Sequence, residues 1–385
     1  MAITTDEVAY LRAHPESIAA AAQELALTKK SLVADATVLR ERHGEYGRAV
    51  IELITARRAG VDKFPGTWLA DGDTAQQATP RPVAQERARR LVAAGARLVH
   101  DVTCSIGTEG APAREAGLGW LGSDLDPARL AMARHNLGDD AWLLRADALA
   151  PVSTDAVDVV VADPARRSGG RRITDPAQLI PPLPDLLAAY VGREVAVKCA
   201  PGLDFSGWDG LVSIASVDGA VKEACLYTPG LAQGARREAV MVLGGQVDRV
   251  TDGEPDDVGA GELGRFIIDP DGAVVRAGLV RHYARREGLW MLDERIAYLT
   301  GDRIPAGRTG FEVLEQVPLK RLKAALAAHG AGGVEILVRG VDVDPDQLRK
   351  KLKLKGKKQM AVVCTRIGRT GVAVICGPRT PGDQD

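Results

Sequence analysis

Apolar and polar residues repeat with two different periods along this chain. In residues 1 to about 60, apolar residues recur at positions i, i+3 and i+4 among strong helix formers, and this period predicts helices. Further along, short β-branched and apolar runs alternate with helical stretches. The runs predict strands at 98–102, 119–124, 142–145, 157–163 and 194–199. Strands alternating with helices over roughly 100 residues predict βαβ units and therefore a parallel sheet of the α/β class.

The segments around this alternating region follow other patterns. Residues 63–82 are rich in Gly, Pro, Asp and Thr and predict a connector, and residues 82–95 predict a helix. Asp126 and Pro127 are the expected N-cap and first residue of another helix. Two β-rich runs around Asp218 and Gly219 predict a hairpin, and a strand follows it at about residue 237, so we expect the sheet to end antiparallel.

The C-terminal part alternates strands and helices again. Residues 246–262 are acidic, glycine-rich and poor in apolar residues, which predicts a flexible surface loop. A strand, a turn and a helix are expected next, and from residue 311 a small α/β module. The predicted organisation is a helical region with its connector (1–80), the main α/β domain (81–245), a linker or extension (246–310) and a small basic domain (311–380).

Composition narrows the class of protein. A chain of 385 residues with 45% hydrophobic residues can bury a stable core without disulfide bonds or a structural metal ion. The five cysteines are scattered and never form a CxxC pair, and the six histidines have no metal-ligand spacing, so we expect reduced thiols and no metal. No run is long enough to span a membrane, and no signal peptide is visible at the start. These features predict a soluble, cytoplasmic protein.

Charge is segregated between the two ends of the chain. Residues 311–385 contain 14 Lys and Arg against 8 Asp and Glu, whereas residues 1–310 contain 36 against 43. The run RKKLKLKGKK at 349–358 places seven cations in ten residues, a density suited to phosphate contacts, although a solvated helix face would have the same composition. The candidate RNA-binding residues are Arg349, Lys350, Lys351, Lys353, Lys355, Lys357 and Lys358.

Acidic residues end four successive predicted strands. They are Asp101, Asp124, Asp147 and Asp163. In an open parallel sheet the carboxyl ends of the strands line the crevice that binds ligands. An acid after the second strand can accept hydrogen bonds from a ribose diol, which serves a nicotinamide cofactor equally well. A third acid can receive an adenine amino group, and this feature favours S-adenosylmethionine.

The segment DPARR follows the fourth strand and predicts the acceptor site. A prolyl turn after Asp163 can hold its carboxylate or carbonyl against the group that is modified, and Arg166 can bind a phosphate.

Cys199, at the end of the fifth strand beside Lys198, is a candidate nucleophile, because a neighbouring cation lowers the pKa of a thiol. A small buried core residue is the other interpretation of Cys199.

Together these segments resemble a known family. KFPGTWLADGDTAQQATP, DVTCSIGTEG, GSDLDP and DPARR, followed by the C-terminal stretch from PLKRLKAALAAHG to AVVCTRIG, are similar to bacterial class I S-adenosylmethionine-dependent methyltransferases with a C-terminal THUMP-like domain. The resemblance implies a Rossmann-like sheet and methylation of RNA, either tRNA or rRNA. The implied cofactor-binding residues are Asp101, Cys104, Gly107, Thr108, Asp124, Asp147, Ala148 and Asp163.

Three other functions stay open from the sequence. A methyltransferase acting on a small molecule or a protein would leave the basic run without a nucleic-acid role. A nicotinamide-dependent enzyme would need a hydride-transfer site, and no such site is visible. Ser105 stands where the first glycine of the cofactor loop is expected, and Ala165 stands where a second proline is expected. These departures leave room for a non-catalytic RNA-binding protein with a degenerate cofactor site.

Overall fold

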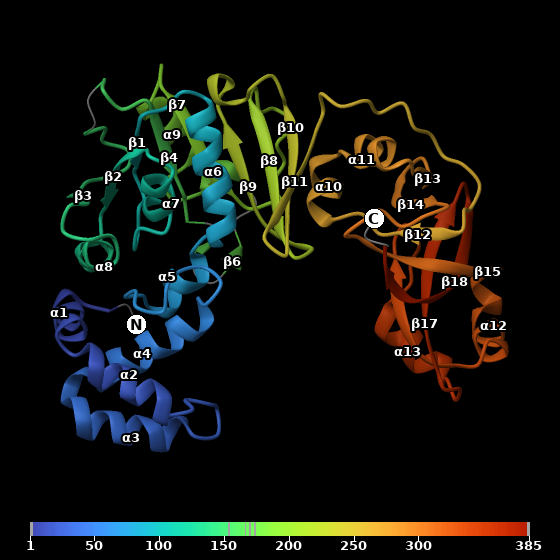
Figure 1. Ribbon diagram of the computed structural model, residues 1–385, viewed down its shortest axis with the longest axis horizontal. Coiled ribbons are helices and arrows are strands. Elements are labelled where there is room, and N and C mark those ends of the chain that lie inside the picture. Colours follow the sequence, from blue (N-terminus) through green and yellow to red (C-terminus); the bar gives the residue numbers. More distant parts are fainter. Residues whose placement is uncertain (1–2, 153–154, 166, 169–170, 173–174, 383–385) are drawn as a thin grey trace. The chain divides into compact units, whose positions relative to one another are not determined.

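The computed structural model describes residues 3–152, 155–165, 167–168, 171–172 and 175–382 (Figure 1). The chain divides into two compact units. The first contains residues 1–236 and 240–248, and the second contains residues 237–239 and 249–385. Of the helices in the described part of the chain, none combines the length and the apolar character that crossing a bilayer requires.

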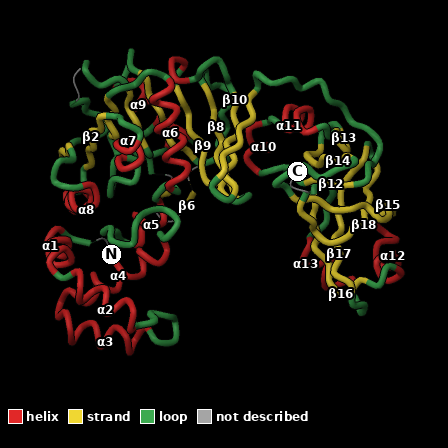
Figure 2. Tube along the Cα trace, in the orientation of Figure 1, coloured by secondary structure: helices red, strands yellow, loops and turns green. Residues whose placement is uncertain are grey.

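The first unit begins with a group of helices, as expected for residues 1 to about 60 (Figure 2). They are α1 (Thr5–Ala13), α2 (Pro15–Glu24), α3 (Leu32–His43) and α4 (Gly47–Ala59). A capping box between Thr4 and Glu7 starts α1. The buried residues of these helices share one core with Phe64, Trp68 and Ile106, so the helices pack on the connector and on the loop after the first strand.

The connector contains a short helix that the sequence pattern does not reveal. Helix α5 (Gly72–Gln77) begins with Asp71 and Thr74 in a reciprocal capping arrangement. Its low apolar content hides the helical period. Helix α6 (Arg81–Ala93) follows, close to the predicted bounds.

A nine-stranded sheet forms the centre of the first unit. Its strand order is β11-β10-β8-β9-β7-β4-β1-β2-β3. The five predicted strands are present and run parallel to one another: β1 (Leu98–Asp101), β2 (Gly119–Asp124), β3 (Trp142–Arg145), β4 (Val159–Ala162) and β7 (Glu194–Cys199). Because β2 and β4 lie on opposite sides of β1, the winding reverses at β1, and this switch point is where open α/β sheets bind ligands.

Short helices connect the parallel strands. They are α7 (Gly110–Glu115), α8 (Pro127–Leu137) and α9 (Leu183–Ala189). Asp126 caps α8 through the backbone N–H groups of Ala128 and Arg129, as predicted. Side chains of α6 and α7 share a core with Val99, Val159 and Ala196, so these helices cover one face of the sheet (Figure 1). The two-residue strands β5 (Arg167–Ser168) and β6 (Arg171–Arg172) pair with each other outside the main sheet.

The remaining strands of this sheet are β8 (Leu211–Val217), β9 (Ala220–Tyr227), β10 (Arg237–Leu243) and β11 (Gln246–Thr251). Asp218 and Gly219 both have positive φ, which makes the predicted hairpin turn between β8 and β9. Strand β9 runs antiparallel to β7, so the expected antiparallel end of the sheet is confirmed. The expected loop at 246–262 is wrong at its start, where β11 forms. This edge strand has few apolar residues: Val250 is buried, and Arg249 pairs with Glu238 of β10.

The second unit is built on a seven-stranded sheet of order β13-β14-β12-β15-β18-β17-β16. The strands are β12 (Phe266–Ile268), β13 (Trp290–Asp293), β14 (Ile296–Gly301), β15 (Thr309–Pro318), β16 (Ala331–Val338), β17 (Lys358–Ile367) and β18 (Thr370–Pro381). The helices are α10 (Gly272–Ala277), α11 (Val280–Glu287), α12 (Leu322–Ala328) and α13 (Pro345–Leu352). The alternation predicted from residue 311 is present. Residues 246–310, expected to be a linker or extension, contribute β12, β13 and β14 to the same sheet.

Candidate functional site

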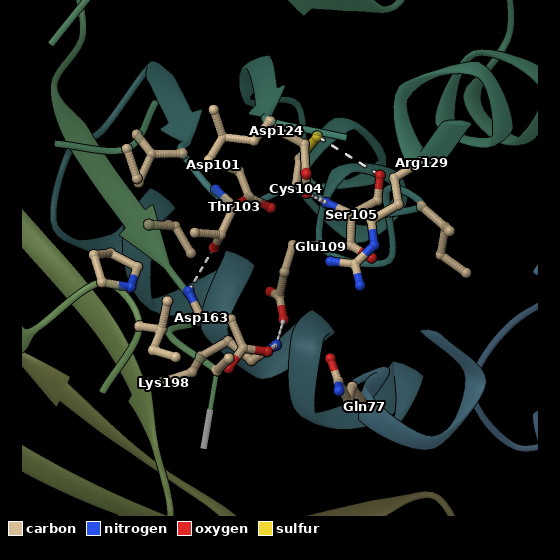
Figure 3. Close-up of a pocket in the computed structure, with 18 of the residues that line it drawn as sticks. Gln77, Asp101, Thr103, Cys104, Ser105, Glu109, Asp124, Arg129, Asp163 and Lys198 are labelled. Carbon is tan, nitrogen blue, oxygen red and sulfur yellow. Dashed lines mark hydrogen bonds and ion pairs between the residues drawn. The ribbon is translucent and has the colours of Figure 1, made fainter. Parts of the chain in front are cut away.

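A cavity of about 370 Å³ opens at the carboxyl ends of β1, β2, β3 and β4 (Figure 3). Its walls come from the loop after each of these strands, from the end of β7 and from α5. Asp101, Asp124, Asp147 and Asp163 all line it, so the structure brings together the four acids that the strand pattern singled out. Cys104, Thr108 and Ala148, also expected at this site, line the same cavity.

The loop after β1 turns sharply because two of its residues have left-handed backbone. Ser105 has a φ of 50° and Gly107 a φ of 89°. Glycine is favoured at 107 because side-chain-bearing residues rarely adopt this φ, and a Cβ there would also crowd Cδ1 of Leu137 at 2.7 Å. Gly107 is not among the described residues that line the cavity; it shapes the loop that does. A non-glycine residue in Ser105's conformation is uncommon, and such backbone is typically maintained at binding sites.

Asp124 ties this loop to the end of β2. One carboxylate oxygen accepts the backbone N–H of Ser105 at 3.0 Å, and the other accepts the N–H of Asp126 at 2.9 Å. Each oxygen has a second lone pair, so the carboxylate can still accept from a ligand hydroxyl. Asp147, after β3, is more exposed, and its side chain accepts the N–H of Leu149 at 2.9 Å. The apolar side chains of Leu125 and Ala148 line the cavity close by in sequence.

Asp101 is buried at the carboxyl end of β1, with 3% of its surface exposed. Its Oδ1 accepts the N–H of Thr103 at 3.2 Å. Burial, reinforced by the charge of Glu109, raises the pKa of Asp101 to about 8. At neutral pH this side chain is therefore mostly protonated and can donate a hydrogen bond into the cavity.

A buried ion network closes the cavity floor. The Lys198 ammonium lies 2.7 Å from Oδ2 of Asp163 and 3.2 Å from Oε1 of Glu109 (Figure 3). Behind it, Arg87 pairs with Glu109 at 3.0 Å and also with Glu223. The side chains of Arg87 and Lys198 are each only 3% exposed, so the two cations are neutralised almost entirely by these carboxylates.

The network sets the charge of its members. Burial opposes ionisation of Glu109, but the adjacent Arg87 and Lys198 outweigh it and lower the pKa of Glu109 to about 2. Burial also disfavours the Lys198 ammonium, yet Asp163 and Glu109 raise its pKa. Both residues are therefore ionised at neutral pH.

Thr103 connects the loops after β1 and β4. Its hydroxyl accepts the backbone N–H of Asp163 at 2.6 Å. Asp163 is thus held at its backbone by Thr103 and at its carboxylate by Lys198, while a quarter of its side chain stays exposed. A preorganised acceptor of this kind can bind an N–H or O–H group entering the cavity.

Cys199 does not belong to this arrangement. It is fully buried in β7 and is not among the described residues that line the cavity. Successive residues of a strand face opposite sides, so Lys198 reaches the cavity while Cys199 packs on the other side. The Lys198 ammonium is engaged with Asp163 and Glu109, which argues against its activating this thiol, and the nucleophile role stays a prediction. Arg166 lies outside the described residues.

The structure also adds functional candidates that the strand pattern missed. Arg87, Thr103 and Glu109 lie in helices or loops, where a single charged or polar residue carries no signal by itself. Lys198 did carry a signal in the sequence, because a lysine inside an apolar strand is seldom buried without a charged partner. Within the described ranges, no group of three or more histidine, cysteine, aspartate or glutamate side chains is arranged to hold a metal ion.

The seven candidate RNA-binding cations lie in the second unit, in α13, the loop after it and the first residue of β17. All seven side chains are exposed, whereas Leu352 between them is buried. Arg349 pairs with Asp346 of the same helix at 2.8 Å. The run is therefore a surface cluster anchored by an apolar residue, which we term the α13 cluster.

The polar and apolar side chains that line the cavity suit a nucleoside ligand with a cationic part. One region contains Glu109 and Asp163 as carboxylates, which favour a positive charge. Another contains Asp124 and Asp147 next to the apolar Leu125 and Ala148. The volume is in the range of small-molecule and cofactor sites.

Comparisons with known proteins show what this chain is similar to. A family model described as "THUMP domain-like" matches residues 308–378. Two proteins of Mycobacterium tuberculosis, from strains CDC 1551 / Oshkosh and ATCC 25618 / H37Rv, are each 49% identical over 363 residues, covering 88% of this chain and 99% of theirs. Both are described as uncharacterized S-adenosylmethionine-dependent methyltransferases. A crystal structure from Porphyromonas gingivalis W83, provisionally described as a methyltransferase, has a TM-score of 0.66 at 17% identity, covering 86% of this chain and 90% of that one.

Proposed function

Since the chain belongs to the S-adenosylmethionine-dependent methyltransferases, we propose that it methylates RNA, with tRNA or rRNA as the substrate class. The family relationship establishes the enzyme class, the cofactor and the Rossmann-like α/β fold with a C-terminal THUMP-like region. When bound, S-adenosylmethionine supplies a methyl group activated by the sulfonium. The RNA acceptor and the residue roles below are our proposal.

The proposed cofactor-binding residues follow from the side chains that line the cavity. Asp124 would accept the ribose hydroxyls, and Asp147 with Ala148 would hold the adenine. Asp101, Cys104 and Thr108 line the part of the cavity formed by the loop after β1, which would receive the methionine end. Gly107 supports this loop through its backbone conformation.

Asp163 would orient the acceptor. Its carboxylate is ion-paired with Lys198 and offers oxygens that accept hydrogen bonds. An acceptor that presents an N–H or O–H group is therefore favoured. Holding that group in line with the reacting centre is the main contribution the protein makes to such a transfer.

The observation that carries the RNA assignment is the α13 cluster. Seven exposed cations in ten residues, inside the region matched by the THUMP-like family, provide the dense positive surface that binds a phosphate backbone. The resemblance to THUMP domains, which are implicated in RNA binding, supports the same class of partner.

The test is transfer of tritium from labelled S-adenosylmethionine into total RNA from cells lacking this protein. We expect label in one RNA class, and loss of that label with Asp163→Ala. The triple variant Lys350→Glu, Lys351→Glu, Lys353→Glu should raise the RNA concentration needed for transfer. The matched control reverses three exposed cations elsewhere in the same unit, Lys320, Arg321 and Lys323.

Label in protein or in small molecules, with none in RNA, would contradict the proposal and favour a different acceptor. An equal effect of the two triple variants would show that net charge, and not the α13 cluster, governs RNA binding.

A further inference from the structure

A second cavity adjoins the cofactor cavity in the first unit. Its volume is about 490 Å³, and it shares four wall residues with the first: Gln77, Ala78, Asp163 and Ala165. Its other walls come from the connector, the end of β7 and the start of β9. Asp163 is the one charged residue among these four, and it lines both cavities where they adjoin.

The two carboxylates of this second cavity are each ion-paired with a buried cation. Asp163 is paired with the buried Lys198, and Glu223 with the buried Arg87. Glu223 also accepts the hydroxyl hydrogen of Thr79 at 3.1 Å. These ion pairs, in which Arg87 and Lys198 are shared with Glu109, offset part of the negative charge that the two carboxylates present to the cavity.

The two lysines of the second cavity, unlike its carboxylates, have no ion-pair partner among the contacts described for them. The Lys63 ammonium donates to the carbonyl oxygens of Ala75 and Gln76 at 2.8 and 2.9 Å, which fixes it at the end of α5. An ammonium has three N–H donors, so one more can reach a ligand. Lys222 is exposed at the start of β9. Burial, and then the charges of Lys222 and Lys198, lower the pKa of Lys63, as expected where cations converge.

We propose that this second cavity is the acceptor subsite and that Lys63 and Lys222 bind an anionic group of the acceptor. The inference rests on the proposed function: on RNA, the anion is a phosphodiester next to the nucleotide that is methylated. A molecule seated here passes Asp163 to reach the cofactor cavity, so one residue can orient the acceptor while the lysines hold its charged backbone. An uncharged small acceptor would have no use for this pair.

Direct binding tests the subsite independently of RNA methylation. The probes are the four ribonucleoside 5′-monophosphates, with the four nucleosides as uncharged controls, observed by ligand NMR on the full-length protein with S-adenosylhomocysteine present. We expect the wild-type protein to prefer the monophosphates, and Lys222→Glu to weaken that preference about tenfold, as the loss of a charge-assisted hydrogen bond does. Lys222→Arg should keep it.

Lys30→Glu is the matched control, because Lys30 is an exposed lysine of the N-terminal helical region and is not among the described residues that line this cavity. No preference for phosphate in the wild-type protein, or equal binding by Lys222→Glu and Lys30→Glu, overturns the subsite. If the preference and its loss are observed but labelled RNA is not formed, the subsite stands and the RNA proposal fails.

In the transfer assay, the same Lys222→Glu substitution should raise KM for RNA and leave the affinity for S-adenosylmethionine unchanged. A loss of cofactor affinity in this variant would contradict the separation of the two cavities.

Discussion

The ammonium nitrogen of Lys198 lies 2.7 Å from Oδ2 of Asp163, which holds the carboxylate after β4 against a cation from β7. The same ammonium reaches Glu109 in the loop after β1. Three segments that line the cofactor cavity are thus joined through one buried side chain. Lys198 is a positioning residue in this arrangement, and its role can be measured.

Lys198→Met should destabilise the protein by about 3 kcal/mol, because removing one partner of a buried ion network leaves the carboxylates uncompensated. Chemical denaturation measures the loss. Adding Asp163→Asn to Lys198→Met should cost less than the sum of the two single changes. Additive losses would contradict a direct coupling between the two side chains.

The stability of the protein should depend on pH through Asp101. Burial raises its pKa to about 8 from an ordinary value of 3.8. Between these values the folded protein keeps the proton that the unfolded chain has released, so the contribution of Asp101 to stability falls as pH rises, by about 1.4 kcal/mol per pH unit. Asp101→Asn removes this titration. Urea unfolding should therefore show the variant gaining stability relative to wild type from about pH 5 to about pH 8.

The exposed Asp139→Asn variant is the control for that experiment and should follow the wild-type pH profile. A constant difference between Asp101→Asn and wild type across the window would show that Asp101 titrates normally.

Asp124→Asn should weaken binding of S-adenosylmethionine about 10- to 100-fold, since it removes a charged hydrogen-bond acceptor worth about 1.5–3 kcal/mol. Calorimetric titration measures the affinity. Asp126→Asn is the matched control, because asparagine caps a helix as well as aspartate does. Equal losses in the two variants would mean that loop structure, and not contact with the cofactor, explains the effect.

Cys199→Ala should retain methyl transfer within about twofold, with a stability loss of about 1–2 kcal/mol from the small cavity it leaves. The residue is fully buried and is not among the described residues that line the cofactor cavity. Rates are to be compared at saturating cofactor, with folding checked by thermal unfolding. Abolished transfer in a folded variant would restore the nucleophile hypothesis.

The local pattern of residues was enough to predict several features of this protein. Short β-branched runs ending in acids placed Asp101, Asp124, Asp147 and Asp163 at strand ends, and the parallel sheet brought those ends to one edge. The hairpin at Asp218 and the cap of α8 follow from turn and capping chemistry that acts over a few residues.

Features that depend on contacts between distant segments could not be predicted in this way, because they arise only when the chain is folded. Glu109, Lys198 and Arg87 lie far apart in the chain, and their charges acquire a role only when the fold buries them together. Strand β11 has few apolar residues and lies at the edge of the sheet next to β10, where Arg249 pairs with Glu238, so its pattern resembled a loop. Strands β12 to β14 likewise join the sheet of the second unit through backbone pairing. Hydrogen bonds between strands, and ion pairs across a core, leave no periodic trace in a sequence.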